Sequence, residues 1–189
     1  MNLIFAGLIF VLMDINNQFG TITINLLPSF DILPDFLGYL LIALGLRTTA
    51  DKSICFKKVR PYIRAAGVYT LLLYALDFWE ITDRLGALGL FAHLIATILT
   101  LYTTYLIGLG LNDLEDARFC VLRAYAVYEA WRALMISRVA AYAYQLLVIY
   151  PPHLPEVFVL EFALISTLCT LYFLFRFGQA RHRYYRFIR

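Results

Sequence analysis

The residues of this chain that could do chemistry are a few ionisable side chains in strongly apolar surroundings. His93 lies within an apolar run, and Asp77 and Glu80 lie at the end of the run before it. Glu161 lies in the last apolar run. A charged group inside a membrane helix is costly to bury without a partner, so such residues often mark an ion path, a substrate site or a proton relay. They predict attraction of a cation or transfer of a proton, whereas one histidine with no ligand spacing predicts no metal site.

Arg138 adds a basic group to these candidates. It shares a polar helical face with Tyr142 and Gln145. An arginine in an apolar helix needs a carboxylate or carbonyl partner. Glu161 on the following helix is the expected partner, and Glu129 is the local alternative.

Two further acids lie in the segment TITINLLPSFDILPDFLGYLLIALGL, residues 21–46. Pro34 suits the first position of a helix, and Asp35 then lies in the first turn, where a negative charge meets the positive end of the helix dipole. Asp31 lies outside that helix, and only a cap or an Asx turn would explain it structurally. Both aspartates are therefore candidates for binding a cation.

A polar stripe follows one face of the helix that carries His93. Thr97, Thr100 and Thr104 recur at steps of three and four residues, which keeps them on that face. If this face meets the polar face of the preceding helix, which includes Asp77, a polar seam runs inward from the acids. The alternative is that the threonines form an ordinary contact surface between membrane helices.

Composition indicates the class of protein that must position these residues. Apolar residues make up 62% of the 189 residues and charged residues 15%, against roughly half and a quarter in soluble domains. We therefore expect an all-α, polytopic integral membrane helical bundle with about six transmembrane helices in a single domain, residues 1–189. No nucleotide, nucleophile or zinc-protease motif is present, so no cofactor is predicted.

Apolar runs between breakers predict helices over residues 2–13, 34–46, 61–81, 87–111, 134–150 and 156–177. The first two are too short to cross a bilayer of about 30 Å. Residues 14–33 between them are predicted to be extracytoplasmic or re-entrant, and paired short helices are a pointer to a binding site in transporters. Residues 117–133 are predicted to be an interfacial amphipathic stretch.

The distribution of lysine and arginine predicts that both termini are cytoplasmic. Basic residues concentrate in the loop after the second helix and in the tail, residues 178–189, whereas Arg84 alone lies on the opposite side. Eight of the thirteen acids then gather outside: Asp14, Asp31, Asp35, Asp77, Asp83, Glu80, Glu156 and Glu161. Such a cluster predicts an outer vestibule that attracts cations, although acids are also simply tolerated in outer loops.

The basic rim at the cytoplasmic side suits a particular partner. Lys52, Lys57, Lys58 and Arg60 combine with an arginine- and tyrosine-rich tail, a composition that attracts anionic lipid headgroups. Nucleic acid binding is not expected, because an ordinary cytoplasmic tail has the same composition.

The segment LPDFLGY, residues 33–39, together with FKKVRPYIRAAGVYTLLLYALDF and GLNDLED, resembles a group of small polytopic membrane proteins of Gram-positive, Clostridium-type bacteria. The resemblance covers roughly residues 1–116. It implies a location in the bacterial cell membrane and no particular chemistry, because the group has no assigned activity.

Three functions fit these observations. The first is a small-solute or cation-binding membrane protein, either a transporter or the membrane subunit of one, with its site among Asp31, Asp35, Asp77, Glu80, His93, Arg138 and Glu161. The second is a non-catalytic assembly or regulatory subunit that binds a membrane protein partner or forms a homo-oligomer. The third is an intramembrane enzyme that acts on a lipid-linked substrate, with His93 and the acids transferring protons.

Overall fold

The computed structural model describes residues 1–13, 34–49, 53–79, 81, 85, 87–118, 121–149 and 157–188. These residues confirm the all-α prediction and form six helices. They are α1 (Asn2–Leu12), α2 (Asp35–Thr49), α3 (Ile54–Phe78), α5 (Ala87–Arg118), α6 (Ala124–Ile149) and α7 (Val157–Ile188).

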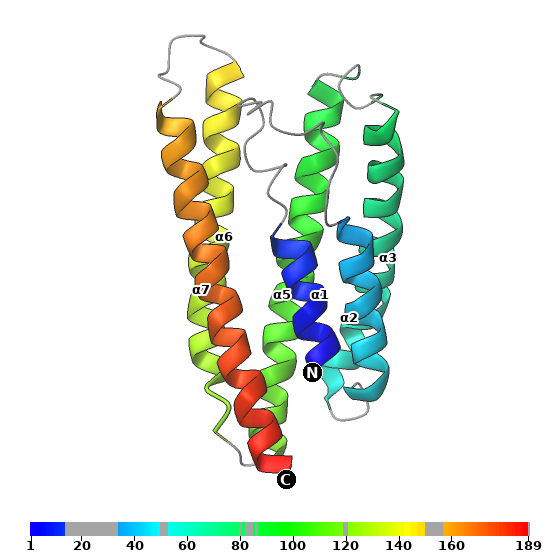
Figure 1. The fold of residues 1–189 in the computed structure, drawn as a ribbon, viewed down its shortest axis with the longest axis vertical. Helices are drawn as coiled ribbons and strands as arrows, with labels where there is room; N and C mark the ends of the chain where they lie inside the picture. Colours follow the sequence, from blue (N-terminus) through cyan, green and yellow to red (C-terminus); the bar gives the residue numbers. More distant parts are fainter. Residues whose placement is uncertain are drawn as a thin grey trace.

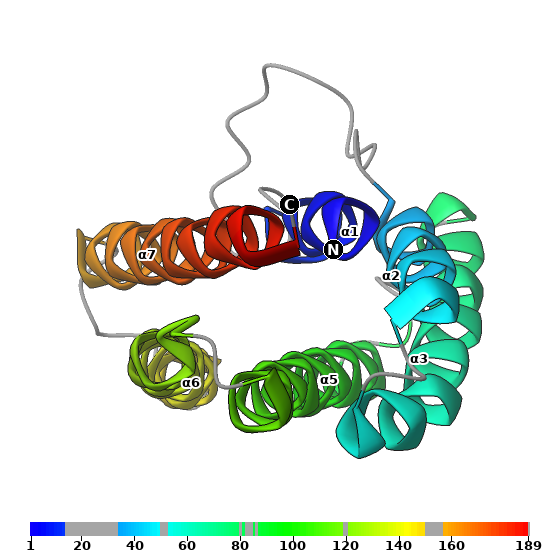
Figure 2. The ribbon, with the colours of Figure 1, turned by 90° about the horizontal axis from the view of Figure 1, so that it is seen from below.

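The helices run alternately up and down and form a closed ring. Seen along the bundle, the order around the ring is α1, α2, α3, α5, α6 and α7 (Figure 2). Each helix packs against the next one in the chain, and α1 packs against α7 to close the ring. Both termini lie at the same end of the bundle (Figure 1).

Glycines allow α1 and α2 to cross closely. A Cβ atom on Gly38 would lie 2.6 Å from Cγ2 of Val11 and 2.8 Å from the carbonyl oxygen of Gly7. A Cβ atom on Gly45 would lie 2.7 Å from Cγ1 of Ile4. Small residues let membrane helices approach to backbone contact. The crossing holds the last turn of α1 beside the first turn of α2.

The start of α3 differs from the prediction, because the helix begins at Ile54 and contains Pro61. Ser53 caps it by accepting a hydrogen bond from the backbone N–H of Phe56 at 3.3 Å. The Asp113 carboxylate on α5 accepts hydrogen bonds from the Ser53 hydroxyl at 2.8 Å and from the backbone N–H of Cys55 at 3.0 Å. These bonds satisfy donors that a helix start leaves open, and they place the start before the proline.

A second carboxylate at the end of α5 caps α6. Glu115 accepts hydrogen bonds from the backbone N–H groups of Arg123 at 3.3 Å and Ala124 at 2.8 Å. Arg123 has a φ of 60°, where the chain turns into the helix. Residues 117 and 118 thus belong to α5, and α6 is one helix from Ala124 onward rather than a separate stretch up to residue 133. Its location at an interface stays a prediction.

The basic segment predicted as a tail, residues 178–189, is a continuation of α7 as far as Ile188. Its arginine, alanine and glutamine residues are good helix formers. The Arg181 guanidinium also lies 4.3 Å from the ring centroid of Phe5 on α1. This cation–π contact stabilises the packing of the extended α7 against α1.

Among the described residues, two helices are long and apolar enough to cross a membrane: Phe91–Ala117 in α5 and Glu161–Phe187 in α7. By the same criteria α1 is apolar but short, with 11 residues. The described residues thus contain two candidate membrane-spanning helices. The expected number of about six transmembrane helices stays a prediction.

Candidate functional site

The two short helices end inside the bundle. α1 has 11 residues and α2 has 15, whereas α5 and α7 have 32 each. At a rise of 1.5 Å per residue, the short pair is about half as long as the long helices or less. The last turn of α1 and the first turn of α2 consequently lie about midway along the bundle (Figure 1).

A polar cavity lies at this depth, between α1, α2, α5, α6 and α7. The space open to the centres of water molecules is about 50 Å³, which is enough for a few waters or a small solute. Its apolar lining includes Val11, Leu12, Leu101 and Leu134. The polar lining residues are Asp35, His93, Thr97, Thr100, Arg138, Tyr142 and Ser166.

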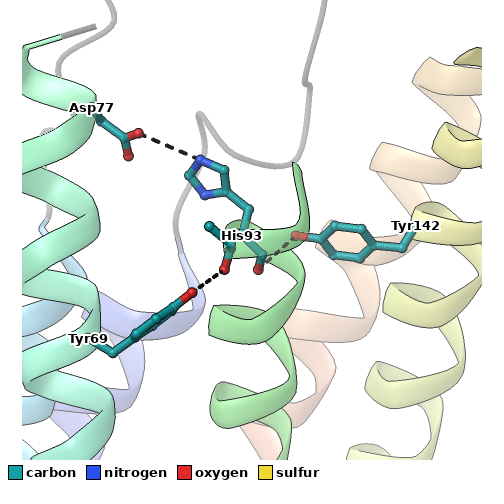
Figure 3. Close-up of polar contacts among 5 residues, drawn as sticks. Tyr69, Asp77, His93 and Tyr142 are labelled. Atoms are coloured by element: carbon teal, nitrogen blue, oxygen red, sulfur yellow. Dashed lines mark hydrogen bonds and ion pairs between the residues drawn. The ribbon is translucent and has the colours of Figure 1, made fainter. Parts of the chain in front are cut away.

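His93 connects this cavity to α3. Its Nε2 atom lies 3.7 Å from Oδ1 of Asp77, an ion pair when the imidazole is protonated (Figure 3). Its side chain is 22% exposed, against 39% for Asp77, so the aspartate faces the more open side. The Tyr69 hydroxyl donates to the carbonyl oxygen of Ala92 at 2.9 Å, one residue before the histidine. α3 thus holds the first turns of α5 through two polar contacts.

Two tyrosines meet the threonine face of α5. The hydroxyls of Thr97 and Tyr142 lie 2.8 Å apart, as do those of Thr100 and Tyr39. Both threonine hydroxyls also donate to carbonyl oxygens one turn earlier in α5, at 3.1 Å and 2.9 Å. Because the Thr100 proton is directed at its own helix, Tyr39 donates to Thr100. The Tyr142 hydroxyl lies near two acceptors, the Thr97 hydroxyl at 2.8 Å and the carbonyl oxygen of His93 at 3.4 Å (Figure 3). The stripe therefore binds α2 and α6 to α5 and also lines the cavity.

Arg138 has a different partner from the one predicted. Its Nη2 atom donates to the carbonyl oxygen of Leu12 at 3.4 Å, at the C-terminal end of α1. A positive charge is favourable there because the last carbonyls of a helix lack intrahelical donors and the helix dipole is negative. Glu161 is exposed on α7, and no ion pair joins it to Arg138 in the part of the chain that the structure describes.

Ser166 supplies a buried hydroxyl from α7. The residue is 1% exposed, it lines the cavity, and its Oγ atom has no hydrogen-bond partner among the described residues. Buried hydroxyl groups in folded proteins nearly always have a partner. The cavity wall therefore offers a donor and acceptor to a molecule bound inside it.

The candidate residues are thus only partly gathered. Asp35, His93 and Arg138 line one cavity, and Asp77 contacts His93 from outside it. Glu161 is not part of the cavity lining. Asp31 and Glu80, like all the other residues of the segment 14–33, lie outside the described residues, so the acidic outer vestibule stays a prediction.

Tyr39 and Ser166 were not among the candidates from the sequence. Tyr39 lies in the segment LPDFLGY, and its position in the sequence predicts no role for it. Ser166 is preceded by Ala163 and followed by Thr170 at steps of three and four residues, a small and polar face that marks a helix contact or a site. That spacing was the available signal.

The fold and the cavity define a class: a helical bundle with two candidate membrane-spanning helices and a polar cavity at mid-depth. No protein-family model, curated protein or solved structure matches the chain. The resemblance to small polytopic proteins of Clostridium-type bacteria stays a prediction.

Proposed function

We propose that this chain is a multi-pass membrane protein that binds a small cationic or zwitterionic solute in the polar cavity, as a transporter or the membrane subunit of one. The observation that carries the proposal is the cavity itself. Charged and hydroxyl groups from four helices, α2, α5, α6 and α7, converge where two short helices end. One of those groups is the buried Ser166 hydroxyl, which has no hydrogen-bond partner among the described residues. Helices that stop at mid-depth commonly build substrate sites in transporters.

Support for insertion in a membrane comes from the outer faces of the helices. Large apolar side chains are exposed along α2, α3, α5, α6 and α7, among them Leu40, Val68, Leu72, Phe91, Ile98, Ile136, Val139, Leu164, Leu168 and Phe175. A soluble monomer rarely exposes apolar patches of this extent. Lipid would cover them, and α3 and α6 would then cross the bilayer beside α5 and α7.

Support for the orientation comes from the two ends of the bundle. The end that holds both termini also holds the ends of α2 and α7 and the start of α3 (Figure 1), which carry Arg47, Arg60, Arg183 and Arg186. Because lysine and arginine are retained on the inner side, this end would be cytoplasmic. Asp77 would then lie toward the outside.

The class of solute follows from the size and charge of the cavity. About 50 Å³ suits an ion or a small amine rather than a drug-sized molecule. Asp35 provides a carboxylate, and the threonine and tyrosine hydroxyls provide further oxygen ligands. Arg138 adds a guanidinium beside the Leu12 carbonyl of α1, so a small zwitterion is the second member of this class.

The first test is a thermal-stability screen of the detergent-purified protein against metal cations, small amines and amino acids. A solute that binds only the folded state stabilises it by about 2.7 kcal/mol at a hundredfold excess over its dissociation constant. The site variants are Asp35→Asn and Ser166→Ala. The matched controls are Glu161→Gln, an exposed carboxylate outside the cavity, and His182→Ala, an exposed histidine near the C-terminal end of α7.

The expected result is a stabilising solute whose effect is lost in Asp35→Asn, reduced in Ser166→Ala and kept in both controls. Ser166→Ala removes a hydroxyl without a described partner, so it should leave the stability of the solute-free protein unchanged or higher. The proposal is wrong if no solute stabilises the wild type, or if the stabilisation survives in both site variants.

An assembly or regulatory subunit is the second candidate. The observation that favours it is that the hydroxyls of Thr97, Thr100 and Thr104 all bond to neighbouring helices, Thr104 through Nε1 of Trp131 at 3.2 Å. These bonds would then serve only to hold helices together. Under this reading Thr100→Val lowers stability and no solute raises it. An intramembrane enzyme stays a prediction from the sequence.

A further inference from the structure

A second cavity lies on the outer side of α2 and α3, near the end of the bundle that holds the termini. Its volume is about 80 Å³, and all of its lining in the described part of the chain comes from these two helices: Leu40, Ala43, Leu44, Arg47, Arg60 and Arg64. Half of this lining is cationic and half is aliphatic. We call it the arginine groove.

Arg60 is the anchored member of the arginine groove. Its Nη2 atom donates to the carbonyl oxygens of Leu46 at 3.1 Å and Arg47 at 3.4 Å, in the last turns of α2. Its Nε atom is buried and has no hydrogen-bond partner among the described residues. A guanidinium has five N–H donors in a fixed plane, so the contacts with α2 hold the group in place and leave donors for another acceptor.

Arg47 and Arg64 complete a cluster of like charges. Both are exposed, and Arg64 follows Arg60 by one helical turn, a spacing at which like charges repel. None of the three arginines forms an ion pair with a carboxylate in the described ranges. The free energy of this cluster falls when an anion binds between the guanidinium groups, and phosphate oxygens suit their geometry.

The aliphatic half of the groove indicates what carries the anion. Leu40 and Leu44 are 57% and 39% exposed and lie two turns and one turn before Arg47 on α2, respectively. Val68, one turn beyond Arg64 on α3, is 60% exposed. An apolar track therefore leads from the arginines toward the middle of the bundle on both helices. Such a site matches a headgroup phosphate with acyl chains lying along the helices.

We infer that the arginine groove binds the phosphate group of an anionic phospholipid. The inference depends on the proposed membrane location and cytoplasmic orientation, because basic pockets between helices at that face are suited to anionic lipids. It shares no residue with the solute cavity, so the two proposals can fail separately.

The experiment measures thermal unfolding of the lipid-depleted protein in detergent during titration with dioleoyl phosphatidylglycerol or dioleoyl phosphatidylcholine. The groove variant is Arg47→Gln with Arg64→Gln, because neither of these exposed side chains makes a described contact that holds α2 to α3, and the Arg47 carbonyl that accepts from Arg60 is kept. The matched control is Arg183→Gln with Arg186→Gln, which removes the same charge near the same end of the bundle. Inorganic phosphate in a third titration tests a soluble anion as the source.

We expect phosphatidylglycerol to stabilise the wild type and the control alike, and phosphatidylcholine to have little effect. The groove variant should bind phosphatidylglycerol about 30-fold more weakly, as expected for the loss of two basic contacts near a membrane surface. The inference is overturned if both lipids act equally or if the control loses as much affinity as the groove variant. Equal stabilisation by inorganic phosphate would overturn the assignment to a lipid.

Discussion

The crossing of α1 and α2 predicts opposite effects for the same substitution at two glycines. An added methyl group on Gly38 would meet Cγ2 of Val11 at 2.6 Å and the carbonyl oxygen of Gly7 at 2.8 Å. A backbone oxygen cannot move aside without shifting its helix. Gly108 on α5 has no atom within 4 Å of the position of an added Cβ, so Gly108→Ala is the matched control.

The magnitudes follow from two opposing effects. Replacing glycine by alanine within a helix gains about 0.5–1 kcal/mol, and Gly108→Ala should show that gain alone. Forcing an extra carbon into a packed contact costs about 1–3 kcal/mol. Gly38→Ala should therefore lower the free energy of unfolding by a net amount of about 1–2 kcal/mol.

The assay is unfolding of both variants in mixed micelles, followed by circular dichroism, with solute affinity as a second measurement. Because the crossing places Asp35 and the Leu12 carbonyl at the cavity, Gly38→Ala should also weaken solute binding, and Gly108→Ala should not. If Gly38→Ala proved as stable as Gly108→Ala, the close crossing and the positioning derived from it would be wrong.

Three other predictions concern the contacts of α5 with α3 and α6. Asp113→Asn should destabilise the protein by about 1–2 kcal/mol, because the Asp113 carboxylate accepts two hydrogen bonds at the start of α3. The control Asp116→Asn should cost less than half as much, because the Asp116 carboxylate makes an exposed side-chain contact. Burial and the Asp113 carboxylate raise the pKa of the Cys55 thiol, so at pH 8 less thiolate is present than for an ordinary cysteine. In a chain with the other two cysteines replaced, maleimide should therefore modify Cys55 more slowly than an ordinary cysteine. The Asp113→Asn substitution should raise the rate of that modification. Trp131→Phe should lower the free energy of unfolding by about 1 kcal/mol, since the indole N–H donates to the Thr104 hydroxyl and to an α5 carbonyl. Thermal unfolding measures the change, and an unchanged stability would show that solvent replaces these bonds.

Helix positions were largely predictable because they depend on local patterns. Composition and breakers placed a helix close to each of the six observed ones, and they identified the first two as short. The pattern was least reliable at ends controlled from elsewhere in the chain. α3 starts at Ile54 because Asp113, 60 residues after Ser53 in the sequence, supports its cap. A proline at position 61 was the stronger local signal, and it was misleading.

By itself, the sequence determined which residues share a helical face and which helices fall short of the bilayer thickness. It placed His93, Thr97 and Thr100 on one stripe and Asp35 in a first turn, because a period of 3.6 residues is a property of one helix. Only the tertiary structure decided what each face meets. Arg138 bonds to a carbonyl 126 positions away in α1 rather than to Glu161 on the next helix, because ring closure brings the end of α1 beside α6 and α7. The partner of a side chain depends on helix order and depth, and helical periodicity carries no information about either.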